Sequence, residues 1–276
     1  MGAGALAAMP RLDVKDVTKT YRVSRDGSTQ PALGRVNLSV DDGEFVSLVG
    51  PSGCGKSTLL RIIAGLESAS EGTAYFDGEP IAGPSRRRGM VFQEYALPPW
   101  KTVRANVELG LKFRGVAAAE RRMIAARWIA LVGLQGFEDR YPQELSGGMR
   151  QRCALARTLA NDAELLLMDE PFAALDAQTR EIMQDELLKI WGEPAEPARR
   201  KTVLFVTHSI DEAIYLSDRV VVMSVRPGVI KEVFVNTLSR PRTEAIRASG
   251  EFLTARHHLW TLVREEALKA MTQREA

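Results

Sequence analysis

The most constraining feature of this chain is a glycine-rich octapeptide that lies between a β-prone run and a helical run. The pattern G-x-x-x-x-G-K-[ST] is matched by Gly50, Pro51, Ser52, Gly53, Cys54, Gly55, Lys56 and Ser57. Residues 45–49 before the loop are mostly apolar, and residues 57–64 after it have a helical pattern that is closed by Gly65. Strand, glycine loop and helix in this order predict a phosphate-binding loop in an α/β protein.

Each part of this loop has a physical role in holding a polyphosphate. Glycines let successive backbone N–H groups turn toward the anion, and the start of the helix adds about half a positive charge. We expect Lys56 to reach the β and γ phosphates, Ser57 to ligate Mg²⁺, and Thr58 to complete the nucleotide site. The alternative is an ordinary glycine turn that is followed by a surface lysine.

A second candidate pair follows another apolar run. Residues 165–168 read Leu-Leu-Leu-Met and lead directly into Asp169 and Glu170. In an open parallel sheet the carboxyl ends of the strands present the ligand-binding groups. We therefore expect Asp169 to hold Mg²⁺ and Glu170 to act as the base that orients a water for attack on the γ-phosphate. Apolar runs that end in Asp-Glu are also common surface exits, so the pair gains its meaning from the glycine loop.

The remaining patterns extend this α/β sheet. Apolar runs at residues 203–206 and 220–223 predict strands that are buried on both faces. Period-two alternation predicts two antiparallel strands near the start, joined by a turn at residues 25–28, through Leu12, Val14, Val17, Val36, Leu38 and Val40. Helical periodicity through Ile124 and Trp128 predicts a helical insertion over about residues 94–160. One apolar helical stripe is predicted near the end of the chain, through Phe252, Leu253, Leu259, Trp260, Val263 and Ala267.

Composition excludes several classes of protein. A net charge of +2 and 45% hydrophobic residues are typical of a globular chain, not of a disordered or fibrous one. The longest stretch without Asp, Glu, Lys or Arg spans residues 45–55, and a membrane helix needs roughly 20 apolar residues. The basic clusters at residues 86–88 and 199–201 are short and are interpreted as solvated loops, so no nucleic-acid partner is expected. Cys54 and Cys153 lack metal-site spacing and fit buried thiols in a reducing compartment.

A third motif points to a family. Residues 145–152 read Leu-Ser-Gly-Gly-Met-Arg-Gln-Arg and resemble the signature motif of ATP-binding-cassette (ABC) ATPases. From the residues alone, Ser146 can cap a helix whose first amides face an anion, although a plain turn before a helix is possible. The resemblance implies that this motif faces the γ-phosphate held by a second copy of the chain, so that two copies sandwich two ATP molecules head to tail. The residues so implied are Ser146, Gly147, Gly148 and Gln151.

Four single positions match the same family. Tyr21 resembles the aromatic residue that stacks on adenine, and Gln93 resembles the glutamine that contacts Mg²⁺ and the attacking water and reports to the membrane partner. Asp176 resembles a residue of the loop that crosses the dimer interface. His208 resembles the switch histidine that hydrogen-bonds the γ-phosphate. Without the resemblance, Tyr21 is a strand-edge aromatic, Asp176 a helix cap and His208 a satisfied core or loop residue.

The resemblance covers roughly residues 12–230 and implies a fold and a domain organisation. The fold is α/β: a P-loop NTPase of ABC type, with a mainly parallel central sheet, an antiparallel β edge and an inserted helical subdomain over about residues 94–160. The organisation is a flexible N-terminus over residues 1–11, an ABC ATPase domain over residues 12–240 and a C-terminal helical tail over residues 241–276.

Finer matches look like the nitrate, sulfonate and taurine branch of bacterial importers, although Pro98 stands where that branch often has leucine. The matches lie at residues 94–103, 169–180 and 205–213. They imply a peripheral ATPase on the cytoplasmic face of the cell membrane that uses ATP and Mg²⁺. Its partners are a second copy of itself, permease subunits and, indirectly, an extracytoplasmic solute-binding protein. Another importer, an exporter and a soluble non-transport ATPase are the alternatives; a DNA-repair or chromosome-organising ATPase needs a long heptad insertion, which residues 55–169 lack.

Overall fold

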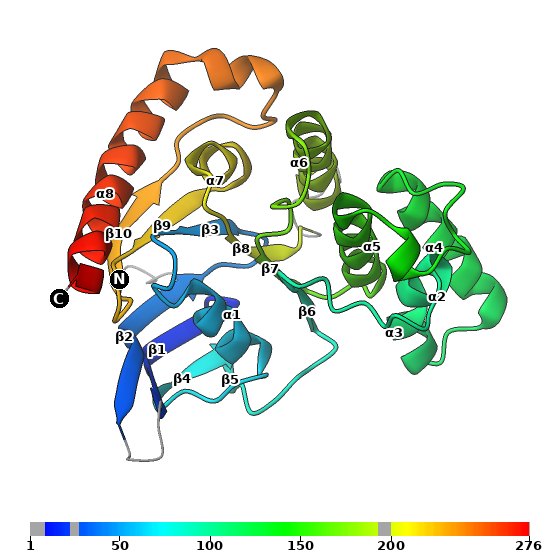
Figure 1. Cartoon of the computed structure of the whole chain (residues 1–276), viewed down its shortest axis with the longest axis horizontal. Coiled ribbons are helices and arrows are strands. Elements are labelled where there is room, and N and C mark those ends of the chain that lie inside the picture. Colours follow the sequence, from blue (N-terminus) through cyan, green and yellow to red (C-terminus); the bar gives the residue numbers. More distant parts are fainter. Residues whose placement is uncertain (1–8, 23–27, 193–199, 276) are drawn as a thin grey trace, which may run out of the picture.

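A computed structural model describes residues 9–22, 28–192 and 200–275, and within them two sheets enclose one helix (Figure 1). The larger sheet has the order β10-β9-β3-β8-β7-β6. Its strands are β3 (Phe45–Val49), β6 (Arg88–Val91), β7 (Leu165–Asp169), β8 (Thr202–Val206), β9 (Arg219–Met223) and β10 (Ile230–Val235). All neighbours in this sheet are parallel except β9 and β10, which confirms the mainly parallel sheet.

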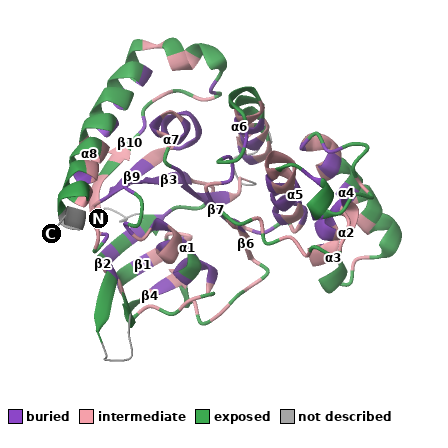
Figure 2. Cartoon of the chain, in the orientation of Figure 1, coloured by how far each residue is buried: buried purple, intermediate pink, exposed green. Residues whose placement is uncertain are grey.

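Both faces of the central strands are covered, which explains their continuous apolar character. On β7, Leu165 and Leu167 pack toward helix α1 (Lys56–Ala64) and the smaller sheet. Leu166 and Met168 pack on the opposite face, against the helices of the other layer. In Figure 2 the central strands and α7 (Ile210–Leu216) are largely buried, so the core lies on both sides of the larger sheet.

The smaller sheet is antiparallel, as its alternating sequence predicts. Its order is β2-β1-β4-β5, and its strands are β1 (Leu12–Arg22), β2 (Thr29–Val40), β4 (Glu71–Phe76) and β5 (Glu79–Pro80). The first two strands pair antiparallel, with Leu12 opposite Val40 and Val14 opposite Leu38. Residues 25–27 of the predicted turn lie outside the described residues.

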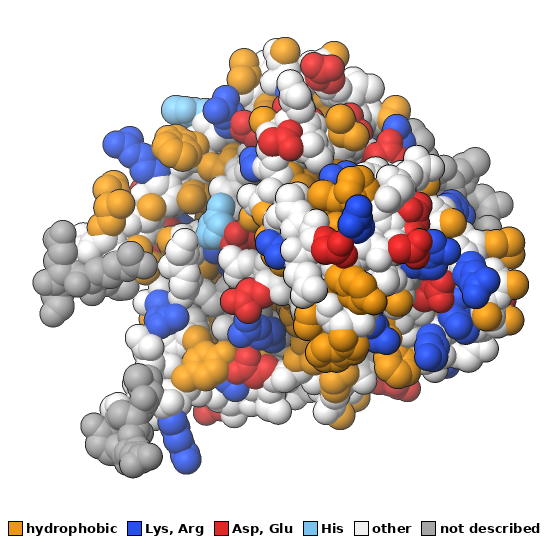
Figure 3. All heavy atoms as spheres, turned by 45° about the vertical axis from the view of Figure 1, so that its right-hand side comes forward, with side chains coloured by type: hydrophobic (Ala, Val, Ile, Leu, Met, Phe, Trp, Pro, Cys, Tyr) orange, Lys and Arg blue, Asp and Glu red, His pale blue; other side chains and the backbone are white. Residues whose placement is uncertain are grey.

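A helical subdomain is inserted between β6 and β7, as predicted, although its limits remain a proposal. It contains α2 (Val103–Val107), α3 (Leu109–Phe113), α4 (Ala118–Leu131), a 3₁₀ turn (Pro142–Glu144) and α5 (Gly147–Ala160). α5 contacts α2, α3, α4 and strand β6, so it joins the insertion to the sheet. Figure 3 shows the side of the molecule on which this subdomain lies, where hydrophobic, basic and acidic side chains are intermixed. α6 (Ala177–Gly192) follows β7.

The C-terminal helix α8 (Gly250–Glu275) lies against β9 and α7 after a 3₁₀ turn (Glu244–Ala248). The prediction of one apolar stripe on this helix is wrong. Phe252 and Leu259 are buried, whereas Leu253 and Trp260 are 50% and 56% exposed. Residues seven positions apart lie on the same face of a helix. Phe252 and Leu259 therefore lie on the face that packs against the rest of the domain, and Leu253 and Trp260 lie beside it in solvent.

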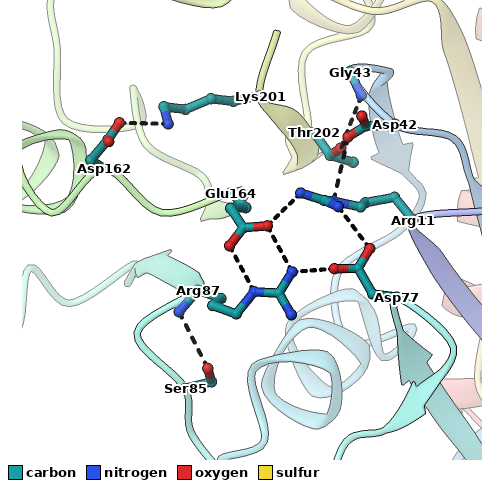
Figure 4. Close-up of polar contacts among 10 residues, drawn as sticks. All are labelled: Arg11, Asp42, Gly43, Asp77, Ser85, Arg87, Asp162, Glu164, Lys201 and Thr202. Atoms are coloured by element: carbon teal, nitrogen blue, oxygen red, sulfur yellow. Dashed lines mark hydrogen bonds and ion pairs between the residues drawn. The ribbon is translucent and has the colours of Figure 1, made fainter. Parts of the chain in front are cut away.

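An ion-pair network lies at the amino ends of the central strands (Figure 4). Arg87 donates to Glu164 at 2.7 Å and also pairs with Asp77. Arg11 pairs with Asp77 at 2.8 Å and with Glu164, and its nearest guanidinium nitrogen to Asp42 lies at 3.3 Å. The interpretation of the basic clusters as solvated loops is therefore wrong for Arg87, because carboxylates distant in sequence surround it.

The structure also bears on the N-terminal segment, the second basic cluster and the two cysteines. The N-terminal segment expected to be flexible lies mostly outside the described residues, and Arg11 at its end is held by the network above. In the second basic cluster, Lys201 pairs with Asp162 at 2.7 Å, and Arg199 lies outside the described residues. Cys54 and Cys153 are both buried free thiols, as expected. No helix in the described residues is long and apolar enough to cross a membrane.

Candidate functional site

The glycine loop connects the carboxyl end of β3 to the start of α1. Helix α1 has Gly55 at its N-cap, no side-chain hydrogen bond caps it, and no acidic residue lies in its first turn. The first amide N–H groups of a helix have no partner within the helix. With no capping side chain to satisfy them, and with the positive end of the helix dipole beside them, these groups are suited to bind an anion.

Lys56 is the first residue of α1, and its side chain is buried against its own loop. The ammonium group donates to the carbonyl oxygens of Gly50 at 2.9 Å and Pro51 at 3.0 Å, and lies 3.6 Å from the Cys54 sulfur. To bind a phosphate, the Lys56 ammonium must exchange these carbonyl oxygens for phosphate oxygens. The predicted reach of Lys56 toward the β and γ phosphates stays a prediction.

Ser57 and Asp169 meet although 112 positions separate them. The Ser57 hydroxyl donates to the Asp169 carboxylate at 3.0 Å. Burial raises the pKa of Asp169, and the hydrogen bond from Ser57 opposes that shift. The described residues contain no group of three His, Cys, Asp or Glu side chains that could hold a metal ion. Mg²⁺ characteristically binds through one or two carboxylates together with substrate phosphates, so a hydroxyl and a carboxylate oxygen suit it.

Glu170 and His208 also meet, at the ends of neighbouring strands β7 and β8. The distance from the His208 Nε2 atom to the Glu170 carboxylate is 2.6 Å. Glu170 adopts a left-handed backbone conformation with φ 50, which is uncommon for a residue with a side chain. Its N–H donates to the Val206 carbonyl at 3.0 Å, so the adjacent strand holds this backbone. The two residues predicted to act on the γ-phosphate therefore lie together.

Gln151 of the signature helix is held inside its own chain, and its predicted place beside a second copy stays a prediction. Its side chain is buried and links two points of the loop after β7. The amide nitrogen donates to the Glu170 carbonyl at 2.8 Å, and the amide oxygen accepts from the Ala174 N–H at 2.8 Å. These two bonds tie the signature helix to the loop that follows Asp169.

The other signature residues begin helix α5 as the sequence predicts. Ser146 is the N-cap, and its hydroxyl accepts from the Met149 N–H at 3.2 Å. Among the described residues no hydrogen bond or ion pair connects Ser146, Gly147 or Gly148 to the phosphate-binding loop. Asp176 is likewise separate from the loop and accepts from Thr179 N–H at 2.9 Å at the start of α6. Its role at a dimer interface stays a prediction.

Tyr21 and Gln93 lie at the margins of the site. Tyr21 is on β1, with its hydroxyl 3.4 Å from that of Thr58, so the predicted adenine-stacking residue lies beside the helix that follows the loop. Gln93 is exposed and follows Val91, which pairs with Met168 of β7. Strand pairing thus brings Gln93 to the same edge of the sheet as Asp169.

Sequence reasoning missed the backbone that flanks the glycine loop. A side chain at Gly50 would meet the Met223 carbonyl at 2.7 Å, and one at Gly228 would meet the Cys54 carbonyl at 1.8 Å. The Arg226 guanidinium donates to the Gly53 carbonyl at 3.2 Å. The sequence signal was only a proline and a glycine after a strand, which predict a turn and say nothing of its neighbour.

The arrangement of loop, acid pair and histidine on one edge of a parallel sheet, with a helical insertion before the acid pair, defines a P-loop ATPase of the cassette type. The profile of the family described as ABC transporter matches residues 33–173. The chain belongs to the ABC transporter family, as an ATP-hydrolysing cassette.

Known relatives cover nearly the whole chain. It is 54% identical to an uncharacterized ABC transporter ATP-binding protein of Methanocaldococcus jannaschii, over 95% of this chain and 94% of the relative. It is 44% identical to an aliphatic sulfonates import ATP-binding protein of Bacillus thuringiensis, over 88% of this chain and 93% of the relative. A solved bacterial ABC transporter cassette, described as dimeric, is 36% identical with a TM-score of 0.74, over 83% of this chain and 100% of that one.

Proposed function

We propose that this chain powers an importer of a small oxyanion, of which an aliphatic sulfonate is the leading candidate. The observation that carries the proposal is that two pairs of residues are in contact beside the glycine loop. Ser57 contacts Asp169, and Glu170 contacts His208. The sulfonate importer of Bacillus thuringiensis supports the substrate class, at 44% identity. Nitrate and taurine remain in the same proposal, because the chain itself contacts ATP and not the transported solute.

Hydrolysis follows from the residues at the carboxyl edge. The loop amides and Lys56 bind the phosphates, and their positive charge stabilises the transferred group. Ser57, Asp169 and Gln93 would hold Mg²⁺, which neutralises charge on the β and γ phosphates when bound. Glu170 accepts a hydrogen bond from the attacking water. His208 orients the Glu170 carboxylate and donates to the γ-phosphate.

The active form in this proposal is a dimer with ATP between two copies. Solved cassettes that resemble this chain are described as dimeric, one of them in a post-hydrolysis state bound to ADP and phosphate. The Ser146 cap leaves the amides of Gly147 and Gly148 at a helix start, where they can meet the partner's ATP. Interface area then depends on the γ-phosphate, so hydrolysis opens the dimer.

The permease would dock beside the helical subdomain, which keeps this chain peripheral on the cytoplasmic face of the membrane. A cavity of about 460 Å³ lies there, between β6, α3 and α5. Arg86 and Arg114 line it, and Phe113 at its edge is 83% exposed. On the same surface Arg157 of α5 donates to the carbonyls of Tyr95 and Ala96, which links the Gln93 loop to the signature helix. Basic and apolar groups together suit an amphipathic segment that carries an acidic residue.

A pull-down from detergent-solubilised membranes tests the importer assignment. We expect a permease to copurify with the tagged chain, and the solute-binding protein that accompanies it to bind alkanesulfonates more tightly than nitrate or taurine. A permease without a binding protein favours an exporter. Copurification of no membrane protein contradicts the transport proposal.

A Ser146→Arg variant tests the dimer separately. The added bulk and charge lie at the helix start that is proposed to face the partner's ATP. We expect ATP binding within about twofold of wild type, loss of the ATP-dependent dimer, and turnover reduced by about 100-fold, the scale of one lost transition-state contact. Sedimentation of a Glu170→Gln background with ATP, with and without Ser146→Arg, measures the dimer, and phosphate release by the single Ser146→Arg variant measures turnover. A dimer of normal stability in the double variant contradicts the trans site.

A further inference from the structure

The glycine loop rests on a second loop, residues 224–229, that follows strand β9. Gly228 lies so close to the Cys54 carbonyl that a side chain there would approach to 1.8 Å. Arg226 donates to the Gly53 carbonyl at 3.2 Å. The Gly50 position lies against the Met223 carbonyl that begins this second loop, at 2.7 Å from where a side chain would lie. The two backbones are therefore in van der Waals contact along one side of the predicted phosphate site.

The second loop is closed on itself by hydrogen bonds between its two ends. Ser224 N–H donates to the Val229 carbonyl at 2.9 Å, and Val229 N–H donates to the Ser224 hydroxyl at 3.0 Å. Gly228 N–H donates to the Ala32 carbonyl of β2 at 3.0 Å. These hydrogen bonds join the two ends of the loop that carries Arg226 and Gly228, the residues that touch the phosphate loop.

One residue of the C-terminal helix α8 binds the backbone of the 224–229 loop. Glu266 of α8 is 1% exposed, and its carboxylate accepts from the Val225 N–H at 3.0 Å. Lys231 lies 3.1 Å and Lys269 2.6 Å from its other oxygen. Burial by itself would raise the pKa of Glu266, but the hydrogen bonds from Lys269, Val225 and Lys231 outweigh it and lower the pKa to about 2. The carboxylate is thus ionised at neutral pH, where it binds one backbone N–H and two ammonium groups.

We propose that Glu266 is a positioning residue for ATP binding, through which helix α8 sets the phosphate-binding loop. The chain of contact runs from Glu266 to Val225, through the closed loop to Arg226 and Gly228, and on to Gly53 and Cys54. This inference rests on the proposed assignment of residues 50–57 as the phosphate site. It gives the C-terminal helix a role in ATP affinity, while Glu170 and His208 keep the chemistry.

A KM-against-kcat comparison of full-length variants tests this role. We expect Glu266→Ala to raise the Kd and KM for ATP about tenfold, the scale of one lost hydrogen bond to a charged group, and to leave kcat at saturating ATP within about twofold. Glu266→Gln keeps an acceptor for Val225 and should restore most of the affinity. Glu265→Ala is the matched control, since Glu265 neighbours Glu266 and pairs with Lys231 but does not bind the loop; it should match wild type. Wild-type affinity in folded Glu266→Ala, or equal loss in Glu265→Ala, overturns the proposal.

Arg226→Ala tests the same path of contacts from its other end, and it can be measured by itself if Glu266→Ala folds poorly. Arg226 is linked to Gly53 from the surface, so its removal should leave the fold intact and raise the Kd about threefold. Arg226→Ala combined with Glu266→Gln should then match Arg226→Ala alone, and combined with Glu266→Ala should match Glu266→Ala alone, because both act through one loop. Multiplied effects overturn the proposal. Lys56→Ala is the separate check of the phosphate site: normal ATP binding in that variant refutes the site itself and not the link to α8.

Discussion

The amino and carboxyl ends of the central strands form two edges of the sheet, and both carry charged side chains. The two edges differ in the partners that these charges have. At the amino edge, Arg87 and Glu164 form paired hydrogen bonds within a network of opposite charges (Figure 4). At the carboxyl edge, the Lys56 ammonium contacts carbonyl oxygens, and the Asp169 carboxylate accepts one hydroxyl hydrogen bond. The first edge satisfies its charges with one another, and the second leaves them available for a ligand.

The pKa values of two carboxyls on one strand express this difference. Glu164 precedes β7, and the hydrogen bond from Arg87 is the main reason that its pKa is lowered. Asp169 ends the same strand, and burial is the main reason that its pKa is raised. A lowered carboxyl pKa stabilises the fold at neutral pH, and a raised one destabilises it. The comparison teaches that stability is concentrated at one edge and binding capacity at the other.

The largest expected effect comes from Glu170→Gln at the carboxyl edge. An amide cannot accept a proton from water, so we expect kcat for ATP to fall by about 100- to 10,000-fold. ATP binding should stay within about threefold, because the phosphate contacts are elsewhere. Phosphate release and equilibrium ATP titration measure the two quantities. Turnover at the wild-type rate would remove Glu170 from the catalytic step.

A smaller effect is expected from Glu164→Gln at the amino edge. Its partners are partly exposed, so we expect a loss of about 1 kcal/mol in the free energy of unfolding, with KM and kcat unchanged. Because the pKa of Glu164 is lowered, its contribution is present above its ordinary value of 4.5 and is lost as the pH falls below it. Urea unfolding of variant and wild type should therefore converge toward about pH 3.

Two observations would contradict that amino-edge prediction. One is a stability difference that grows as the pH falls. The other is an equal loss in Asp139→Asn, whose pair with Arg104 is exposed on the helical subdomain and serves as the control.

The smallest effect on the free energy of unfolding is expected from Asp169→Asn, and it has the opposite sign. Because the pKa of Asp169 is raised, its stabilising contribution is present below its ordinary value of 3.8 and is lost as the pH rises through the raised value. The neutral amide removes this cost and can still accept from Ser57. We expect the nucleotide-free variant to gain about 0.5–1 kcal/mol at about pH 7, and to lose turnover. Unfolding by urea without nucleotide measures this, and a less stable variant would show that the carboxylate is already well satisfied.

The sequence predicted the parts whose causes are local. Residues 165–168 had to be buried on both faces, and the structure shows Leu165 and Leu166 in different cores. The Ser146 cap was predicted from its own neighbours and is confirmed. The prediction of one apolar stripe on α8 was wrong because periodicity does not give the width of the helix face that packs on the sheet. The sequence did not predict the contacts of Gln151, because its partners lie 19 and 23 positions away, in a loop whose path no local pattern gives.

By itself, the sequence determined the class of the protein: a glycine loop between a strand and a helix, an acid pair after an apolar run, and a signature helix are short-range patterns that chemistry constrains closely. Only the tertiary structure decided which charges would be satisfied. Arg87 finds Glu164 across 77 positions, and Val225 finds Glu266 across 41. The physical reason is that the free energy of a charged group depends on the partners and the solvent that packing brings to it, and packing joins residues without regard to their separation along the chain.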